Sequence, residues 1–145
     1  MTLTAQHIAQ LPADQVAALF RRGEVGQIPD GEADGSVIVW PGSPATAWID
    51  KLVQSIAWQG HVVNARTREL ENRILPLGLR AIRADVYTGC SWFDGADCIV
   101  VDYSKRSLFA RFVRDEIRRV GPGLYLGLVY FGRLRSIYFT LQFTV

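Results

Sequence analysis

The sequence predicts a mainly β protein, a small antiparallel β-barrel with one or two helices on its N-terminal side. The two clear amphipathic helical patterns lie before residue 60, alternating apolar and polar residues dominate the chain after it, and tight-turn motifs separate the alternating runs. Six or more strands joined by short turns are typical of an antiparallel sheet or barrel. An α+β arrangement is the fallback prediction.

Length and composition indicate one globular domain. A chain of 145 residues is close to the commonest domain size, so residues 1–145 are interpreted as a single barrel domain in which residues 1–34 form a helical and loop extension. Apolar residues make up 49% of the chain and charged residues 21%, which excludes wholesale disorder. The chain is also long enough to fold without a metal or disulfide staple.

Two amphipathic segments predict helices. Residues 12–22 begin with a proline in the first turn and end before Gly23, with Val16, Leu19 and Phe20 as the apolar stripe. Residues 44–57 follow the capping residue Ser43 and carry their apolar residues on one face. Residues 23–35, rich in Gly, Asp and Pro, predict a loop.

The predicted strands are short and separated by turns. The strongest is 135–145, in which apolar and polar residues alternate, and Asp94-Gly95 is a hairpin-turn signal. Residues 108–120 also fit helical spacing, but the turn at 121–123 favours a strand for their second half. The full set of predicted strands is 37–40, 61–64, 79–88, 98–103, 111–120, 124–131 and 135–145.

Charge is distributed unevenly along the chain. Residues 1–50 hold two basic and six acidic residues, a net charge of −4, whereas residues 103–145 hold eight basic and two acidic residues, a net charge of +6. A basic face could attract an anionic ligand or a membrane surface. Arginines on strands also keep sheet edges soluble, which needs no partner. The basic residues match no recognised nucleic-acid-binding module, so nucleic acid is not expected as a partner.

Cysteine usage and hydropathy give few functional signals. Cys90 and Cys98 flank the predicted hairpin, where they could pair across neighbouring strands, but free thiols are the simpler expectation. No metal-spaced Cys or His group is present, so no metal or other cofactor is expected. Neither a secretory signal nor a transmembrane stretch is visible, which makes the cytoplasm the expected compartment. The sequence leaves a homodimer open.

Several short runs in the order of the predicted elements resemble a family. They are Ile56-Ala57-Trp58-Gln59-Gly60-His61, Ala84-Asp85-Val86-Tyr87-Thr88-Gly89, Val100-Val101-Asp102-Tyr103, the stretch 113–120, Leu126-Gly127 and Tyr138-Phe139-Thr140-Leu141. Together they resemble a bacterial family of small lipocalin-like proteins of unknown function with a GXWXGK-type motif, over roughly residues 35–143. His61 stands where that family usually has lysine, and Glu116-Ile117-Arg118 departs from its pattern. The resemblance implies a lipocalin-like barrel and no particular reaction.

Polar side chains inside strands are the candidate catalytic residues, because no GxSxG, P-loop or HExxH motif is present. If these side chains point inward, Asp85 or Asp102 would pair with Arg114 or Arg118 as a buried charge cluster. If they point outward, they form a solvated face with cross-strand ion pairs. His61, at the start of a strand, could serve as an acid or base. The candidate set is His61, Asp85, Tyr87, Asp102, Arg114 and Arg118.

Aromatic residues supply the candidate ligand-binding set: Trp58, Tyr87, Trp92, Tyr125, Tyr130 and Tyr138. Trp92 and Phe93 sit at a predicted loop tip, where they could close a barrel mouth, touch a membrane, or fold back as packing. Aromatic residues on the strands could equally fill the core of a small barrel.

Three functions fit these observations. The first is binding of a small, mostly apolar molecule inside the barrel. The second is a cofactor-independent cyclase or isomerase that folds an apolar substrate into a reactive shape in the same cavity. The third is a surface-interaction protein that uses the basic C-terminal half.

Overall fold

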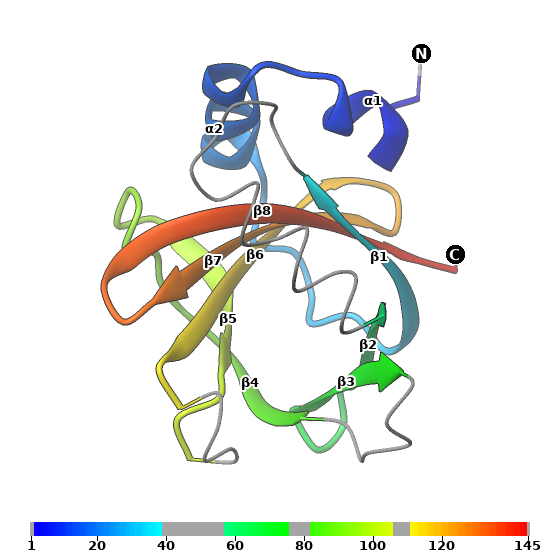
Figure 1. Ribbon diagram of the computed structural model, residues 1–145, viewed down its shortest axis with the longest axis vertical. Helices are drawn as coiled ribbons and strands as arrows, with labels where there is room; N and C mark the ends of the chain where they lie inside the picture. The colour runs from blue at the N-terminus through cyan, green and yellow to red at the C-terminus, as the bar shows by residue number, and fades with distance from the viewer. Residues whose placement is uncertain (1, 39–56, 76–81, 106–110, 145) are drawn as a thin grey trace.

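Eight antiparallel strands close into a barrel in which each strand pairs with the next and β8 pairs with β1 (Figure 1). The structure, a computed structural model, describes residues 2–38, 57–75, 82–105 and 111–144. The strands are β1 Gly31–Ile38, β2 Ala57–Asn64, β3 Glu69–Leu75, β4 Ile82–Cys90, β5 Asp97–Asp102, β6 Val113–Gly121, β7 Leu124–Phe131 and β8 Leu134–Phe143. The predicted mainly β barrel class is therefore confirmed.

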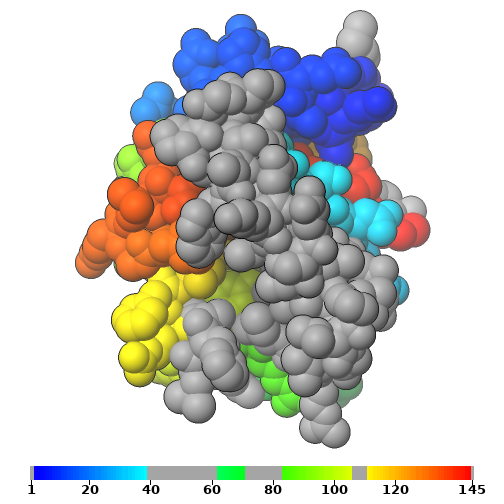
Figure 2. Space-filling view, in the orientation of Figure 1, coloured from blue at the N-terminus to red at the C-terminus, as the bar shows by residue number. Residues whose placement is uncertain are grey.

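Two short helices precede the barrel. Helix α1, Ala5–Ala9, starts at Thr4, whose side chain accepts a hydrogen bond from the His7 amide. Helix α2, Ala13–Arg22, follows Pro12 and ends at Gly23, which confirms the helix predicted over 12–22. Both helices lie on the outer face of the barrel beside β8, and the space-filling view shows them seated against β1 and the end of the chain (Figure 2).

The side chains form two apolar layers on either side of the sheet. The inner layer draws on every strand: Ala33, Val63, Leu70, Ala84, Val86, Ile99, Val101, Tyr103, Ile117, Tyr125, Val129, Phe139, Leu141 and Phe143. The outer layer joins the helices to β1, β7 and β8: Ile8, Val16, Phe20, Ile38, Leu124, Leu126, Leu128, Tyr130 and Tyr138. Strand β7 is buried on both faces because the helices cover its outer side.

Several predicted boundaries were wrong or incomplete. Residues 31–35 were predicted as loop but form the first part of β1, which pairs with β8 from Ala33 to Ile38. The N-terminal extension therefore ends at residue 30 and not at 34. Strand β3 and helix α1 were not predicted. The helix predicted over 44–57 lies outside the described residues except for Ala57, which belongs to β2.

At Gly127 on β7, an aromatic side chain of the neighbouring strand lies close against the backbone. Gly127 pairs with Phe139 of β8, and a Cβ atom at this position would overlap the Phe139 ring. The aromatic ring thus occupies the space that a side chain on β7 would need, which explains a glycine in the middle of a buried strand.

We expect Gly127→Ala to lower the free energy of unfolding by about 1–3 kcal/mol, because the new methyl group displaces the Phe139 ring. Urea denaturation measures the loss. In a background of Phe139→Leu the same glycine change should cost less, because the smaller side chain leaves room. Equal costs in both backgrounds would show that the contact with the ring is not the cause.

Candidate functional site

Among the described side chains of the inner layer, a tyrosine and a carboxylate meet near one end of the barrel. Asp115, on β6, is flanked in its layer by Val101 of β5 and Val129 of β7, and it is 4% exposed. The Tyr103 hydroxyl donates a hydrogen bond to Asp115 Oδ2 at 3.1 Å. A buried carboxylate needs hydrogen-bond partners, so these two side chains form the polar point of the interior.

The opposite end of the barrel is covered by the linker between α2 and β1. Val25 and Ile28 of this linker pack against the inner apolar layer. The Tyr125 hydroxyl donates to the Gln27 carbonyl at 3.1 Å, and Glu24 exchanges two backbone hydrogen bonds with Arg119. Burial raises the pKa of Tyr125. The linker therefore fixes one end of the barrel through both side-chain and backbone contacts.

A buried arginine fastens the β4–β5 loop and α2 to the outer wall of β6. The Arg118 guanidinium donates to both carboxylate oxygens of Asp94, at 2.6 and 2.7 Å. Its other bonds reach the carbonyls of Phe20, Ala96 and Asp97, each at 3.1 Å. All five of its N–H donors are thus used, although the side chain is only 1% exposed.

A second buried charge on the same wall holds the start of that loop. Glu116 Oε1 accepts the Ser91 hydroxyl at 2.6 Å, and Oε2 accepts the Trp92 amide at 2.8 Å. Arg114 donates to Oε2 from Nε and from its terminal nitrogen, at 3.1 and 3.0 Å. Glu116 and Arg118 together clasp the loop of residues 91–96 against β6, and we call this arrangement the loop clasp.

The inward cluster, one of the two predicted alternatives, is not what forms, because the charged strand residues lie on the outer side of the sheet with other partners. Arg114 and Arg118 point outward and are held by Glu116 and Asp94. Asp102 instead accepts the Tyr87 hydroxyl at 3.1 Å on the outer face of β4 and β5, where it stands opposite Asp85. Neither predicted alternative, an inward cluster or a solvated outer face, describes this arrangement. Arg114, Glu116 and Arg118 of β6 face outward, but the β4–β5 loop covers them.

The candidate ligand-binding aromatics are also divided between the two faces. Tyr125 lies in the inner layer, whereas Tyr130 and Tyr138 lie in the outer layer beneath the helices. Tyr87 lies on the outer face with Asp102. Trp92 folds back onto the outer wall between Arg114 and Arg133, with guanidinium carbons 4.2 and 4.1 Å from the ring centroid.

The candidates Trp58 and His61 lie on β2, and their side chains fall outside the described part of the chain. The inner pair of Tyr103 and Asp115 was missed as a site. The sequence pattern could have indicated it. Strand alternation puts Asp115 on the same face of β6 as Val113 and Ile117, and on the opposite face from Arg114 and Glu116.

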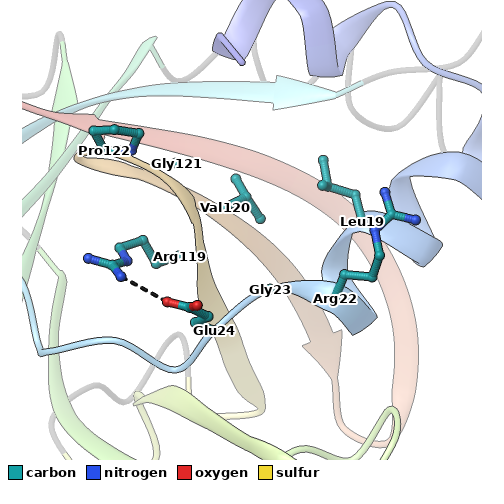
Figure 3. A pocket seen from close by; sticks show the side chains of 8 residues that line it. All are labelled: Leu19, Arg22, Gly23, Glu24, Arg119, Val120, Gly121 and Pro122. Atoms are coloured by element: carbon teal, nitrogen blue, oxygen red, sulfur yellow. Dashed lines mark hydrogen bonds and ion pairs between the residues drawn. The ribbon is translucent and has the colours of Figure 1, made fainter. Parts of the chain in front are cut away.

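An open hollow of about 520 Å³ lies at the covered end of the barrel, between the end of α2 and the β6–β7 turn (Figure 3). Arg22 lines the hollow, and its two other charged residues, Arg119 and Glu24, point toward each other and pair at 2.8 Å. Since both side chains are exposed and satisfy each other, they leave little directed charge for a ligand.

The described residues offer no group of three or more His, Cys, Asp or Glu side chains that could hold a metal ion. Cys90 and Cys98 are free thiols, as expected, and Cys98 opposes Gly89 and not Cys90 in the strand register. Burial raises the pKa of the Cys98 thiol to about 12, so it is a poor nucleophile at neutral pH.

Within the described ranges, no helix has the length and hydropathy needed to cross a membrane. No protein-family model and no curated protein matches the chain. Its structure is similar to the crystal structure of a protein from Thermomonospora curvata, with a TM-score of 0.61. The two chains are 15% identical, and the match covers 93% of this chain and 89% of the other. At this identity the similarity shows a shared fold and nothing about activity.

Acid should weaken the loop clasp. The hydrogen bond from Arg118 lowers the pKa of Asp94 below its usual 3.8, so its contribution to stability is complete above that value and is lost as the pH falls through the folded pKa. We expect Asp94→Asn to lower the unfolding free energy by about 1–3 kcal/mol at neutral pH, a loss that shrinks in acid. Urea denaturation across pH measures this, with the exposed Asp34→Asn as control. A loss that does not change with pH would contradict the assignment.

Proposed function

We propose that this protein binds a small, mostly apolar molecule inside its barrel. The observation that carries the proposal is an apolar inner layer with a carboxylate and a tyrosine hydroxyl at one point. An eight-stranded barrel encloses an interior that side chains fill or that holds one small ligand. Apolar walls with a few placed polar groups are typical of small-molecule sites.

Access in this proposal is from the end where Tyr103 and Asp115 lie. The other end is covered by the α2–β1 linker, whose Val25 and Ile28 pack into the inner layer. Asp115 is two positions from the start of β6, so it stands close to the rim of the barrel at that end. A ligand entering there would place its apolar body along Val101 and Val129 and its polar group near Asp115.

The chemistry of this pair favours a ligand with a hydrogen-bond donor. The Tyr103 hydroxyl donates to Asp115 Oδ2, and a carboxylate accepts hydrogen bonds from hydroxyl and amine groups. A hydroxyl or amine group on an otherwise apolar molecule suits this arrangement. The resemblance to the lipocalin-like family, which we also propose as a relationship, fits such a ligand at the level of fold analogy.

A second candidate is a cyclase or isomerase that works on an apolar substrate at the same place. The observation that favours it is the same buried carboxylate with its hydroxyl partner, because such a pair can accept and return a proton within a water-poor interior. Conversion of a substrate to product would distinguish this candidate from simple binding.

Native mass spectrometry of the purified protein, followed by solvent extraction, tests binding. We expect the wild type to carry a small molecule, or to take up an apolar fluorescent probe such as anilinonaphthalene sulfonate. Ala84→Leu, which adds volume to the inner layer, should abolish binding. Ala18→Leu, the same change on helix α2, is the matched control and should leave binding unchanged.

Asp115→Asn keeps the shape of the interior while removing the charge. This substitution should lower the affinity for a ligand that carries a hydrogen-bond donor by about tenfold or more. A wild type that neither carries a molecule nor takes up the probe would contradict the proposal. So would equal binding by the wild type and a folded Ala84→Leu variant.

A further inference from the structure

The exposed apolar side chains of this protein gather at one corner of the barrel. In the described part of the chain, four large apolar side chains are exposed: Trp92 at 39%, Phe112 at 64%, Phe131 at 42% and Leu134 at 72%. Soluble proteins rarely concentrate such side chains in one place without a binding role.

Backbone pairing brings the β7–β8 turn and the start of β6 to the same edge of the barrel. Phe131 of β7 is the register partner of Val113 on β6 and of Leu134 on β8. The Gly132 amide donates to the Phe112 carbonyl at 2.7 Å, which ties the β7–β8 turn to the start of β6. The Trp92 ring packs edge-on against the ring of Tyr130, the residue before Phe131, with the two centroids 5.3 Å apart. The turn projects from the side of the barrel (Figure 1).

Arginines surround these apolar side chains. Arg111 lies over the Phe112 ring at 4.7 Å, and Arg133 lies over the Trp92 ring at 4.1 Å. Arg135, opposite Tyr130, lies over the Phe93 ring at 4.8 Å. All three arginines are exposed. We call Arg111, Phe112, Phe131, Arg133, Leu134 and Arg135, with Trp92, the basic corner.

The acids beside this corner are Glu116, Asp94 and Asp102, and Asp102 accepts the Tyr87 hydroxyl. Glu116 is fully buried and engaged by Arg114, Ser91 and Trp92. Asp94 is bound through both oxygens to Arg118. No acidic residue occurs in the described segments 111–114 and 129–136, so the exposed charges there are all positive.

We propose that the basic corner docks the protein onto an anionic lipid surface. Phe112, Phe131 and Leu134 would enter the interfacial region while the arginines contact lipid headgroups. Two features favour a membrane: a two-residue turn that projects suits insertion into a soft interface, and arginine charge complements acidic lipids. Trp92, which belongs to the basic corner, is a residue type that favours the membrane–water interface.

The docked orientation turns the rim that carries Tyr103 and Asp115 toward the membrane, because Val113 and Phe131 belong to that rim. An apolar ligand could then pass between bilayer and barrel without crossing water. The docking itself does not require that the barrel hold a ligand, so it can be tested separately from the binding proposal.

Vesicle flotation tests the docking. We expect binding to vesicles of phosphatidylcholine mixed equally with phosphatidylserine, weak binding to phosphatidylcholine alone, and loss of binding as salt rises. Arg133→Gln should lower binding to the anionic vesicles about fivefold, and Leu134→Ser should lower it further. Arg66→Gln, an exposed arginine in the β2–β3 turn, is the matched control and should bind as the wild type does.

Three results would overturn the proposal: no binding to anionic vesicles, equal binding to both vesicle types, or an equal loss in the Arg66→Gln control. All variants alter exposed side chains, so circular dichroism should show the wild-type fold. Sedimentation velocity tests self-association as the alternative role of this corner. A wild-type dimer that Leu134→Ser abolishes, together with no vesicle binding, would assign the corner to dimer formation and overturn the docking proposal.

Discussion

One buried guanidinium organises the outer wall of this barrel. Arg118 donates five hydrogen bonds to Asp94 and to three carbonyls from α2 and the β4–β5 connection, and its guanidinium carbon lies 4.7 Å from the Phe20 ring centroid. A buried ion stabilises a structure only when its hydrogen bonds and charge are fully compensated, as they are here. This constraint joins segments that are 24 and 98 residues apart in the chain.

The loop clasp also explains why the two faces of β6 differ so sharply. Its outward charges, Arg114, Glu116 and Arg118, are all engaged with one another or with the β4–β5 loop. The inward face is then free to be apolar, with Asp115 as its polar point. Three of the charged side chains of β6 thus lie on its outward side.

Local pattern was sufficient to predict the barrel class, helix α2 and strand β7. It failed where tertiary pairing outweighs composition: Gly31–Ile38 contains turn-forming residues, yet it pairs with both β2 and β8 to close the barrel. Strand β3 was missed although Glu69, Glu71 and Arg73 alternate as a strand allows, because Asn72 interrupts the apolar series of Leu70 and Ile74. Strand alternation places Arg114 and Arg118 on one face, but it cannot say that a loop and a helix will bury that face.

Native-state hydrogen exchange at the Trp92 amide tests the loop clasp most directly. This amide lies in a loop but donates to the buried Glu116 carboxylate at 2.8 Å, and the same loop is closed by the Ser91 amide bond to the Ala96 carbonyl at 2.9 Å. If the clasp holds the loop as described, the Trp92 amide should be protected as strongly as amides in the central strands. Exchange at the rate of an open surface loop would contradict it.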